Sequence, residues 1–175
     1  MLTLYSKKRT EIKTGDLLAW KTTRIRTFFD FILFLYQKIL GAEYTHVGIA
    51  VNIGNRIFVL EATPPVVRLF PLSLSDDFYL FPLNVDVKST HLDTLFQALG
   101  KKYSVFDLIR STFNLGNSNN DYYCSELASS FYNSIGIIDN NEAGFTPDSL
   151  IEEITQTFSV QPIPVKIDRG NLYEL

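Results

Sequence analysis

Apolar residues gather in two neighbouring segments of the chain, residues 45–53 and 56–63, that both read as β-strands. Gly54-Asn55 lies between them and is a typical two-residue hairpin loop. In that hairpin Ile53 faces Arg56. One side then carries only apolar side chains: Val47, Ile49, Val51, Phe58, Leu60 and Ala62. This clean separation favours the register, because a slip of one residue would mix the two faces.

The opposite side of the predicted hairpin brings a histidine close to a glutamate. Glu61 lies across from Gly48, so His46 is its diagonal neighbour, within reach of a long side chain. Gly48 and Ala50 are expected to leave empty volume beside the imidazole. A carboxylate bonded to one ring nitrogen would leave the other nitrogen free to act as a base. The alternative is a surface histidine beside a surface glutamate.

Further strands are expected where short apolar runs lie between turn residues. Pro71 and Pro82 should place two of them at sheet edges or strand ends. The predicted strands are residues 17–20, 66–72, 78–83 and 160–167.

Helices are predicted where apolar residues recur with helical spacing. Ser89 or Thr90 should cap one that ends near Gly100, and Thr146-Pro147 should begin another. Residues 27–40 and 104–113 are also expected to be helical. Together, the predicted strands and helices indicate an α+β fold in which helices pack against an antiparallel sheet. Residues 1–175 are expected to form one domain.

Cys124 is the only cysteine, and it lies where a polar loop should change into a helix. Residues 114–121 are turn-rich, helical spacing follows from Leu127, and Gly136 supplies a stop signal. A thiolate in the first helical turn is stabilised by the helix dipole and by free backbone N–H groups. A buried structural thiol is the alternative. Together, Cys124, His46 and Glu61 are the parts that a papain-like site requires.

The bulk composition narrows the classes of function. Hydrophobic residues make up 46% and charged residues 20%, as in globular proteins, and the net charge of −3 argues against a nucleic-acid partner. One cysteine excludes an internal disulfide, and no Cys/His cluster indicates zinc. The first residues lack a signal-peptide pattern, so a cytoplasmic location is expected.

Residues 27–40 form a very apolar segment that contains Asp30. A bilayer span needs about 20 apolar residues, so this segment is too short to cross a membrane. A buried helix is the main interpretation. An interfacial helix that makes peripheral contact with lipid or with an acyl substrate is the alternative.

Several short motifs together resemble a known family. They are Gly15-Asp16-Leu17-Leu18, Thr45-His46-Val47-Gly48-Ile49, Val59-Leu60-Glu61-Ala62, Gly100-Lys101-Lys102-Tyr103 and Tyr123-Cys124-Ser125-Glu126-Leu127. In this order the chain resembles the permuted NlpC-type papain-like amidases of the YiiX/YaeF branch.

That resemblance implies a circularly permuted papain-like fold without a cofactor, in which Cys124 is the nucleophile, His46 the base and Glu61 the third member. It implies hydrolysis of an amide or ester bond, in a cell-wall peptide or a lipid acyl group. Tyr103, Ser125 and Asp16 are expected to contact the substrate, although Asp16 after Gly15 also suits ordinary turn chemistry. Two other functions stay open: a lipid-directed acyltransferase or hydrolase at a membrane surface, and a non-catalytic binding module.

Overall fold

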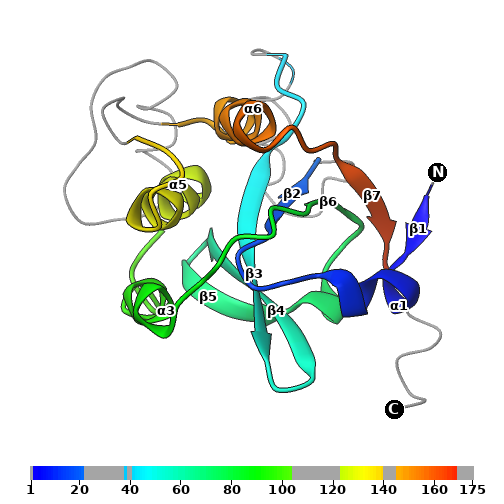
Figure 1. The fold of residues 1–175 in the computed structure, drawn as a ribbon, viewed down its shortest axis with the longest axis horizontal. Helices are drawn as coiled ribbons and strands as arrows, with labels where there is room; N and C mark the ends of the chain where they lie inside the picture. Colours follow the sequence, from blue (N-terminus) through cyan, green and yellow to red (C-terminus); the bar gives the residue numbers. More distant parts are fainter. Residues whose placement is uncertain (1, 22–37, 39–40, 104–122, 140–144, 169–175) are drawn as a thin grey trace.

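The computed structural model describes residues 2–21, 38, 41–103, 123–139 and 145–168. In this part of the chain helices pack against a seven-stranded sheet with the order β1-β7-β6-β2-β3-β4-β5 (Figure 1). The architecture confirms the predicted α+β class. The strands are β1 (Thr3–Leu4), β2 (Leu17–Trp20), β3 (His46–Ile53), β4 (Arg56–Thr63), β5 (Val66–Pro71), β6 (Phe78–Phe81) and β7 (Ile163–Lys166).

The β3–β4 hairpin has the predicted register. Ile53 pairs with Arg56, and Ile49 pairs with Leu60. Gly54 adopts a φ of +60°, which suits glycine at the first position of a two-residue loop. The alternation of side chains therefore determined the pairing of these two strands.

The other predicted strands are present, with corrections to their bounds. β2 has the predicted bounds, β5 is an edge strand that ends at Pro71 rather than at residue 72, and β6 ends at Phe81, before Pro82, rather than at residue 83. β7 is shorter than the predicted 160–167 and begins only after Pro162. β1 was not predicted, and it pairs with β7 in parallel, so the sheet is not wholly antiparallel.

Local sequence signals account for the ends of two helices. Thr146 caps α6 (Pro147–Phe158) by accepting a hydrogen bond from the Ser149 N–H at 3.2 Å. Beyond α5 (Cys124–Ser134), Gly136 has a φ of +72°, and its N–H bonds to the Asn133 carbonyl at 2.8 Å. This is the left-handed stop that glycine favours.

The start of α3 (Ser89–Phe96) differs from the prediction. Lys88 is the capping residue, and its N–H donates to Nδ1 of His91 at 3.3 Å. Ser89 is instead the first helical residue, so neither Ser89 nor Thr90 is the cap. The predicted helices at 27–40 and 104–113 lie outside the described residues, apart from Lys38.

Hydrophobic cores cover both faces of the sheet. One core joins the apolar side of the hairpin to α3, α5 and α6, which Figure 1 shows on one side of the sheet. The other core contains Leu18, Trp20, Ala50, Val59 and Tyr5, the last from the short helix α1 (Tyr5–Lys8). The side of the hairpin that carries His46 and Glu61 is therefore also a packed face.

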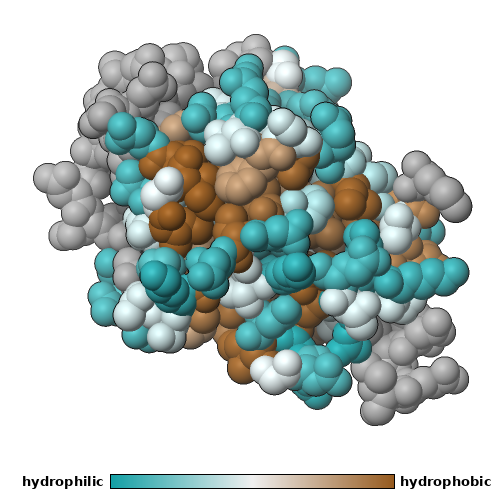
Figure 2. Space-filling model, viewed as in Figure 1, coloured by the Kyte–Doolittle hydropathy of each residue, from teal (hydrophilic) through white to brown (hydrophobic). Residues whose placement is uncertain are grey.

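The outer surface is mixed in character. Figure 2 shows hydrophobic areas broken up by hydrophilic side chains on the face in view. In the part of the chain that the structure describes, no helix combines the length and the apolar character that a membrane span requires.

Candidate active site

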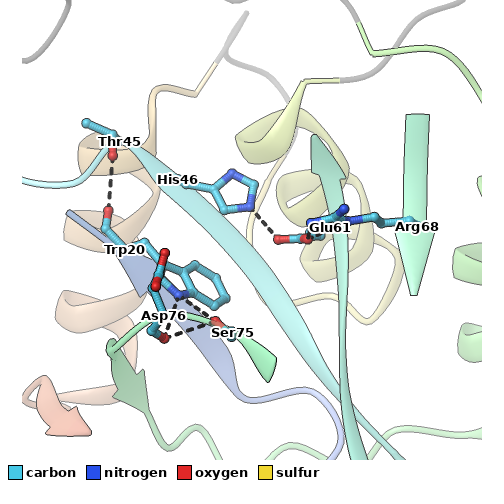
Figure 3. A network of polar contacts seen from close by, with 7 residues as sticks. All are labelled: Trp20, Thr45, His46, Glu61, Arg68, Ser75 and Asp76. Carbon is cyan, nitrogen blue, oxygen red and sulfur yellow. Dashed lines mark hydrogen bonds and ion pairs between the residues drawn. The ribbon is translucent and has the colours of Figure 1, made fainter. Parts of the chain in front are cut away.

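A hydrogen bond joins the histidine and the glutamate that the hairpin pattern paired. Nε2 of His46 lies 2.7 Å from Oε2 of Glu61 (Figure 3). The Glu61 side chain is 7% exposed and that of His46 is 20% exposed. A surface histidine beside a surface glutamate is therefore not what the structure contains. Figure 3 shows the other ring nitrogen, Nδ1, directed away from Glu61, so this atom is left for a different partner.

Gly48 does not leave the empty volume that we expected beside the imidazole. A Cβ atom at Gly48 would lie 2.5 Å from Cγ2 of Val59 and 3.4 Å from Cβ of Glu61. Ala50 is fully buried in the second core. The missing side chain of Gly48 thus makes room for the neighbouring strand, because Val59 and Glu61 occupy that space.

Arg68 is a third member of this polar group that the sequence analysis missed. Its Nε and Nη2 atoms lie 2.8 and 2.7 Å from Oε1 of Glu61. The carboxylate therefore bridges Arg68 and His46, one oxygen to each. Arg68 pairs directly with Glu61 between β4 and β5. The signal was present in the sequence, because Pro64-Pro65 is a two-residue connection that sets this register.

Trp20 was missed as well, and it lies against His46. The two ring centroids are 5.3 Å apart at an interplanar angle of 42°. The indole N–H donates to Oγ of Ser75 at 3.0 Å and to the Asp76 carbonyl at 3.3 Å, which holds the ring in place (Figure 3). Trp20 pairs with His46 between β2 and β3, so the partnership follows from the sheet rather than from local sequence.

Cys124 is the first residue of α5 and is 1% exposed. Its thiol lies close enough to the His46 imidazole to act on the titration of that ring. N–H groups in the first turn of a helix have no partner within the helix. The sole cysteine thus lies between a helix N-terminus and an imidazole that is bonded to a carboxylate.

The charges of His46, Glu61 and Arg68 shift the pKa values of the histidine and the glutamate toward their ionised forms. Burial lowers the pKa of His46, but interactions with Cys124 and with the Glu61 carboxylate raise it to about 10. Burial also opposes ionisation of Glu61, yet His46 and Arg68 hold the pKa of that carboxyl below its ordinary value. The arrangement favours an imidazolium beside an ionised carboxylate.

The three residues expected to contact substrate lie in different settings. The buried Asp16 carboxylate accepts hydrogen bonds from the N–H groups of Lys13 at 2.8 Å and Leu83 at 2.9 Å. Ser125 donates to the Phe145 carbonyl at 2.5 Å. The side chains of Asp16 and Ser125 are thus engaged with the backbone.

Tyr103 is half-buried, and its N–H bonds to the Pro65 carbonyl at 3.0 Å, beside the start of β5. Substrate contact by Asp16, Ser125 and Tyr103 stays a prediction.

Comparison with known proteins identifies the fold but no family. No protein-family model matches the chain. The chain is similar to the crystal structure of the metalloprotein YiiX from Escherichia coli O157:H7, with a TM-score of 0.52, 16% identity, and coverage of 88% of this chain and 89% of that one. The chain therefore has a YiiX-like fold.

A sequence match is much shorter. An uncharacterised protein, R372, of Acanthamoeba polyphaga mimivirus is 32% identical over 60 residues, which are 34% of this chain and 24% of the viral protein. Such a match over a quarter of the relative's length does not define a family.

YiiX is a metalloprotein, which raises the question of whether this chain has a metal site. Among residues 2–21, 38, 41–103, 123–139 and 145–168, no group of three or more His, Cys, Asp or Glu side chains could together hold a metal ion. Both oxygens of Glu61 are already engaged, by His46 and by Arg68. The described side chains of the site therefore do not fit a metal centre.

Proposed function

We propose that this protein is a cysteine hydrolase that cleaves an amide or ester bond through a covalent acyl-enzyme. One observation carries the proposal: the only cysteine begins a helix and lies near enough to influence an imidazole that is bonded to a buried carboxylate. In this assignment Cys124 is the nucleophile, His46 is the general base and acid, and Glu61 orients the imidazole. The YiiX-like fold is compatible with a hydrolase.

In the acylation step, His46 holds the proton of the Cys124 thiol and the thiolate sulfur attacks the substrate carbonyl carbon. The new S–C bond pushes the carbonyl electrons onto oxygen. Backbone N–H groups at the start of α5 are suitable donors for that oxyanion. The intermediate then collapses, the bond to the amine or alcohol breaks, and His46 gives its proton to that leaving group.

In the deacylation step, neutral His46 takes a proton from water, and the resulting hydroxide attacks the thioester carbon. The C–S bond breaks, the carboxylic acid leaves, and the sulfur recovers the proton from His46. Glu61 keeps Nε2 engaged throughout, which leaves Nδ1 to exchange protons with sulfur, leaving group and water.

The acyl substrate is proposed only as a class: an amide of the cell-wall peptide type or a lipid acyl group. Residues 27–40, on which a lipid-directed reaction or a peripheral membrane contact would depend, lie outside the described residues apart from Lys38. The chemistry of the site is the same for either substrate, so the first experiment should not depend on its identity.

Cys124 is the only thiol, so alkylation by iodoacetamide, followed by intact mass, reports on this residue alone. At pH 6 a free thiol is less than about 1% ionised. We expect the wild-type protein to react at least about tenfold faster than the His46→Ala variant at this pH, since the imidazolium stabilises the thiolate. With p-nitrophenyl acetate, Cys124 should acquire an acetyl group that the Cys124→Ala variant lacks.

The other histidine provides a matched control. His91→Ala removes an imidazole that only caps α3, so its alkylation rate should equal that of the wild-type protein. Equal rates for the wild-type and His46→Ala proteins, with no acetylation of Cys124, would contradict the proposal and favour a non-catalytic binding module.

A further inference from the structure

Arg68 makes an unusually complete contact with the glutamate of the site. Two of its nitrogens donate to the same carboxylate oxygen, at 2.8 and 2.7 Å, while the other oxygen is bonded to His46 at 2.7 Å. Two residues along β5, the ring of Phe70 lies 4.6 Å from the guanidinium carbon. The guanidinium is therefore held both by the carboxylate and by a stacked ring.

We propose that Arg68 is a positioning residue of the hydrolase site, which fixes the Glu61 carboxylate so that Glu61 in turn fixes the His46 imidazole. This inference rests on the proposed function and extends the assigned group from three residues to four. Arg68 touches neither Cys124 nor a reacting atom in this assignment, so it acts through Glu61.

The burial of the two partners separates this contact from an ordinary surface ion pair. Exposed pairs contribute little because water screens both charges. Here the Arg68 side chain is 45% exposed but that of Glu61 is only 7% exposed. A buried carboxylate that loses one of two charged donors keeps its desolvation cost without compensation. Removing Arg68 should therefore have a large effect on the ionisation of Glu61, unlike the loss of one partner of an exposed ion pair.

The charged groups that act on Glu61 are His46 from β3 and Arg68 from β5, and Cys124 from α5 acts on His46. Without the guanidinium, burial dominates and the pKa of Glu61 rises. Glu61 then takes up a proton at a higher pH than in the wild-type protein. A neutral carboxyl group no longer supports the imidazolium, and the thiolate of Cys124 loses its partner.

The test follows the alkylation rate of Cys124 as a function of pH in the full chain. We expect the acid limb of Arg68→Ala to lie about one pH unit higher than that of the wild-type protein, so that the variant reacts about tenfold more slowly on that limb. Arg68→Lys keeps the charge but not the two-pronged contact, and it should lie between the two. Added guanidinium, at a concentration too low to unfold the protein, should partly restore the rate of Arg68→Ala.

Arg56→Ala is the matched control, because it removes one exposed arginine from the far end of β4. It should leave the profile unchanged, and guanidinium should have no effect on it. If Arg68→Ala has the wild-type profile while His46→Ala is slow, the role of Arg68 is overturned and the hydrolase proposal stands. If His46→Ala is also as fast as wild type, the hydrolase proposal fails with it. If Arg68→Ala does not fold, an Arg68→Lys profile identical to wild type would overturn the role.

Discussion

His46 takes its character from residues contributed by three different elements. Glu61 of β4 binds Nε2, Trp20 of β2 packs against the ring, and Cys124 at the start of α5 lies near enough to influence the titration of the imidazole. An isolated histidine is neutral above pH 6.5, so a charged histidine near neutral pH depends on these neighbours. At the scale of single residues, the protonation of His46 thus depends on the side chains that surround its imidazole.

Trp20 allows the charge of His46 to be measured directly, because it is the only tryptophan and lies 5.3 Å from the imidazole. A protonated imidazole quenches indole emission. Since contacts with Cys124 and Glu61 outweigh burial and raise the pKa of His46 to about 10, we expect Trp20 emission to stay quenched at neutral pH and to rise with a midpoint near 10. Fluorescence between pH 5 and 11 checks this prediction.

The His46→Gln variant is the control for this titration, because tyrosine ionisation also affects emission at high pH. This variant should lack the rise in Trp20 emission near pH 10. Glu61→Gln should move this rise to lower pH, since it removes a negative charge that favours the imidazolium. A midpoint at or below the ordinary histidine value of 6.5 in the wild-type protein would contradict the prediction.

At the level of elements, the β3–β4 hairpin positions the site through close strand contact. Gly48 lies beside the Glu61 Cβ, and its lack of a side chain lets Val59 pack over β3. β5 then adds Arg68 through direct pairing with Glu61. Three consecutive strands therefore supply the histidine, its carboxylate and the arginine, so the hairpin geometry and the site geometry depend on each other.

Replacement of Gly48 by alanine should destabilise the fold by about 1–3 kcal/mol, the usual cost of overpacking. The new Cβ would lie 2.5 Å from Cγ2 of Val59 and 3.2 Å from the Leu60 carbonyl oxygen. Val59 is β-branched and has little rotamer freedom, so relief must come from the backbone. Urea unfolding measures the loss of free energy of unfolding.

The Gly48→Ala/Val59→Ala double variant tests the stated cause. Val59→Ala removes the methyl group that clashes, so the losses of the two single variants should add to more than the loss of the double variant. Strict additivity would show that Val59 is not the source of the cost. Alkylation of Cys124 in Gly48→Ala would show in addition whether displacement of Glu61 reaches the thiol.

On the scale of the whole molecule, the sheet separates two cores, and His46 and Glu61 lie at their boundary. Cys124 belongs to the core that contains α3, α5 and α6, whereas Trp20 belongs to the core on the other face. The buried charges of His46 and Glu61 are thus part of what the global fold must accommodate. The free energy of unfolding of the protein should therefore depend on the pH at which His46 and Glu61 gain or lose their protons.

The free energy that His46 contributes to folding should depend on pH with a defined sign. Its raised pKa means that this contribution is complete below pH 6.5 and is lost as the pH rises toward about 10. Glu61 has a lowered pKa, so its contribution is complete above pH 4.5 and is lost as the pH falls through the folded-state value. The difference in stability between wild type and His46→Gln should therefore be largest between pH 4.5 and 6.5.

Urea unfolding of both proteins across this range measures the difference, with His91→Gln as the control for loss of a partly exposed imidazole. The difference should shrink by at least about 1 kcal/mol between pH 6.5 and 10, because one unit of pKa shift corresponds to about 1.4 kcal/mol. A difference that grows above pH 6.5 would show that neutral His46 is the form the fold prefers.

The sequence predicted those features that depend on residues close together in the chain. The hairpin register, the Thr146 cap and the Gly136 stop were correct because side-chain alternation, capping and left-handed φ are local properties. The neighbourhood of His46 and Glu61 followed from the same register. The predicted start of α3 was wrong: Nδ1 of His91 accepts a hydrogen bond from the N–H of Lys88, so Lys88 is the capping residue and Ser89 is already helical.

What the sequence by itself determined is thus the chemistry offered by the hairpin and by the cysteine helix. The tertiary structure alone decided that both faces of the sheet are packed, that Val59 and Glu61 fill the space beside Gly48, and that Trp20 lies against His46. The physical reason is range. Periodicity and capping act over a few residues, whereas packing and charge depend on strands that the chain brings together only when the sheet is complete.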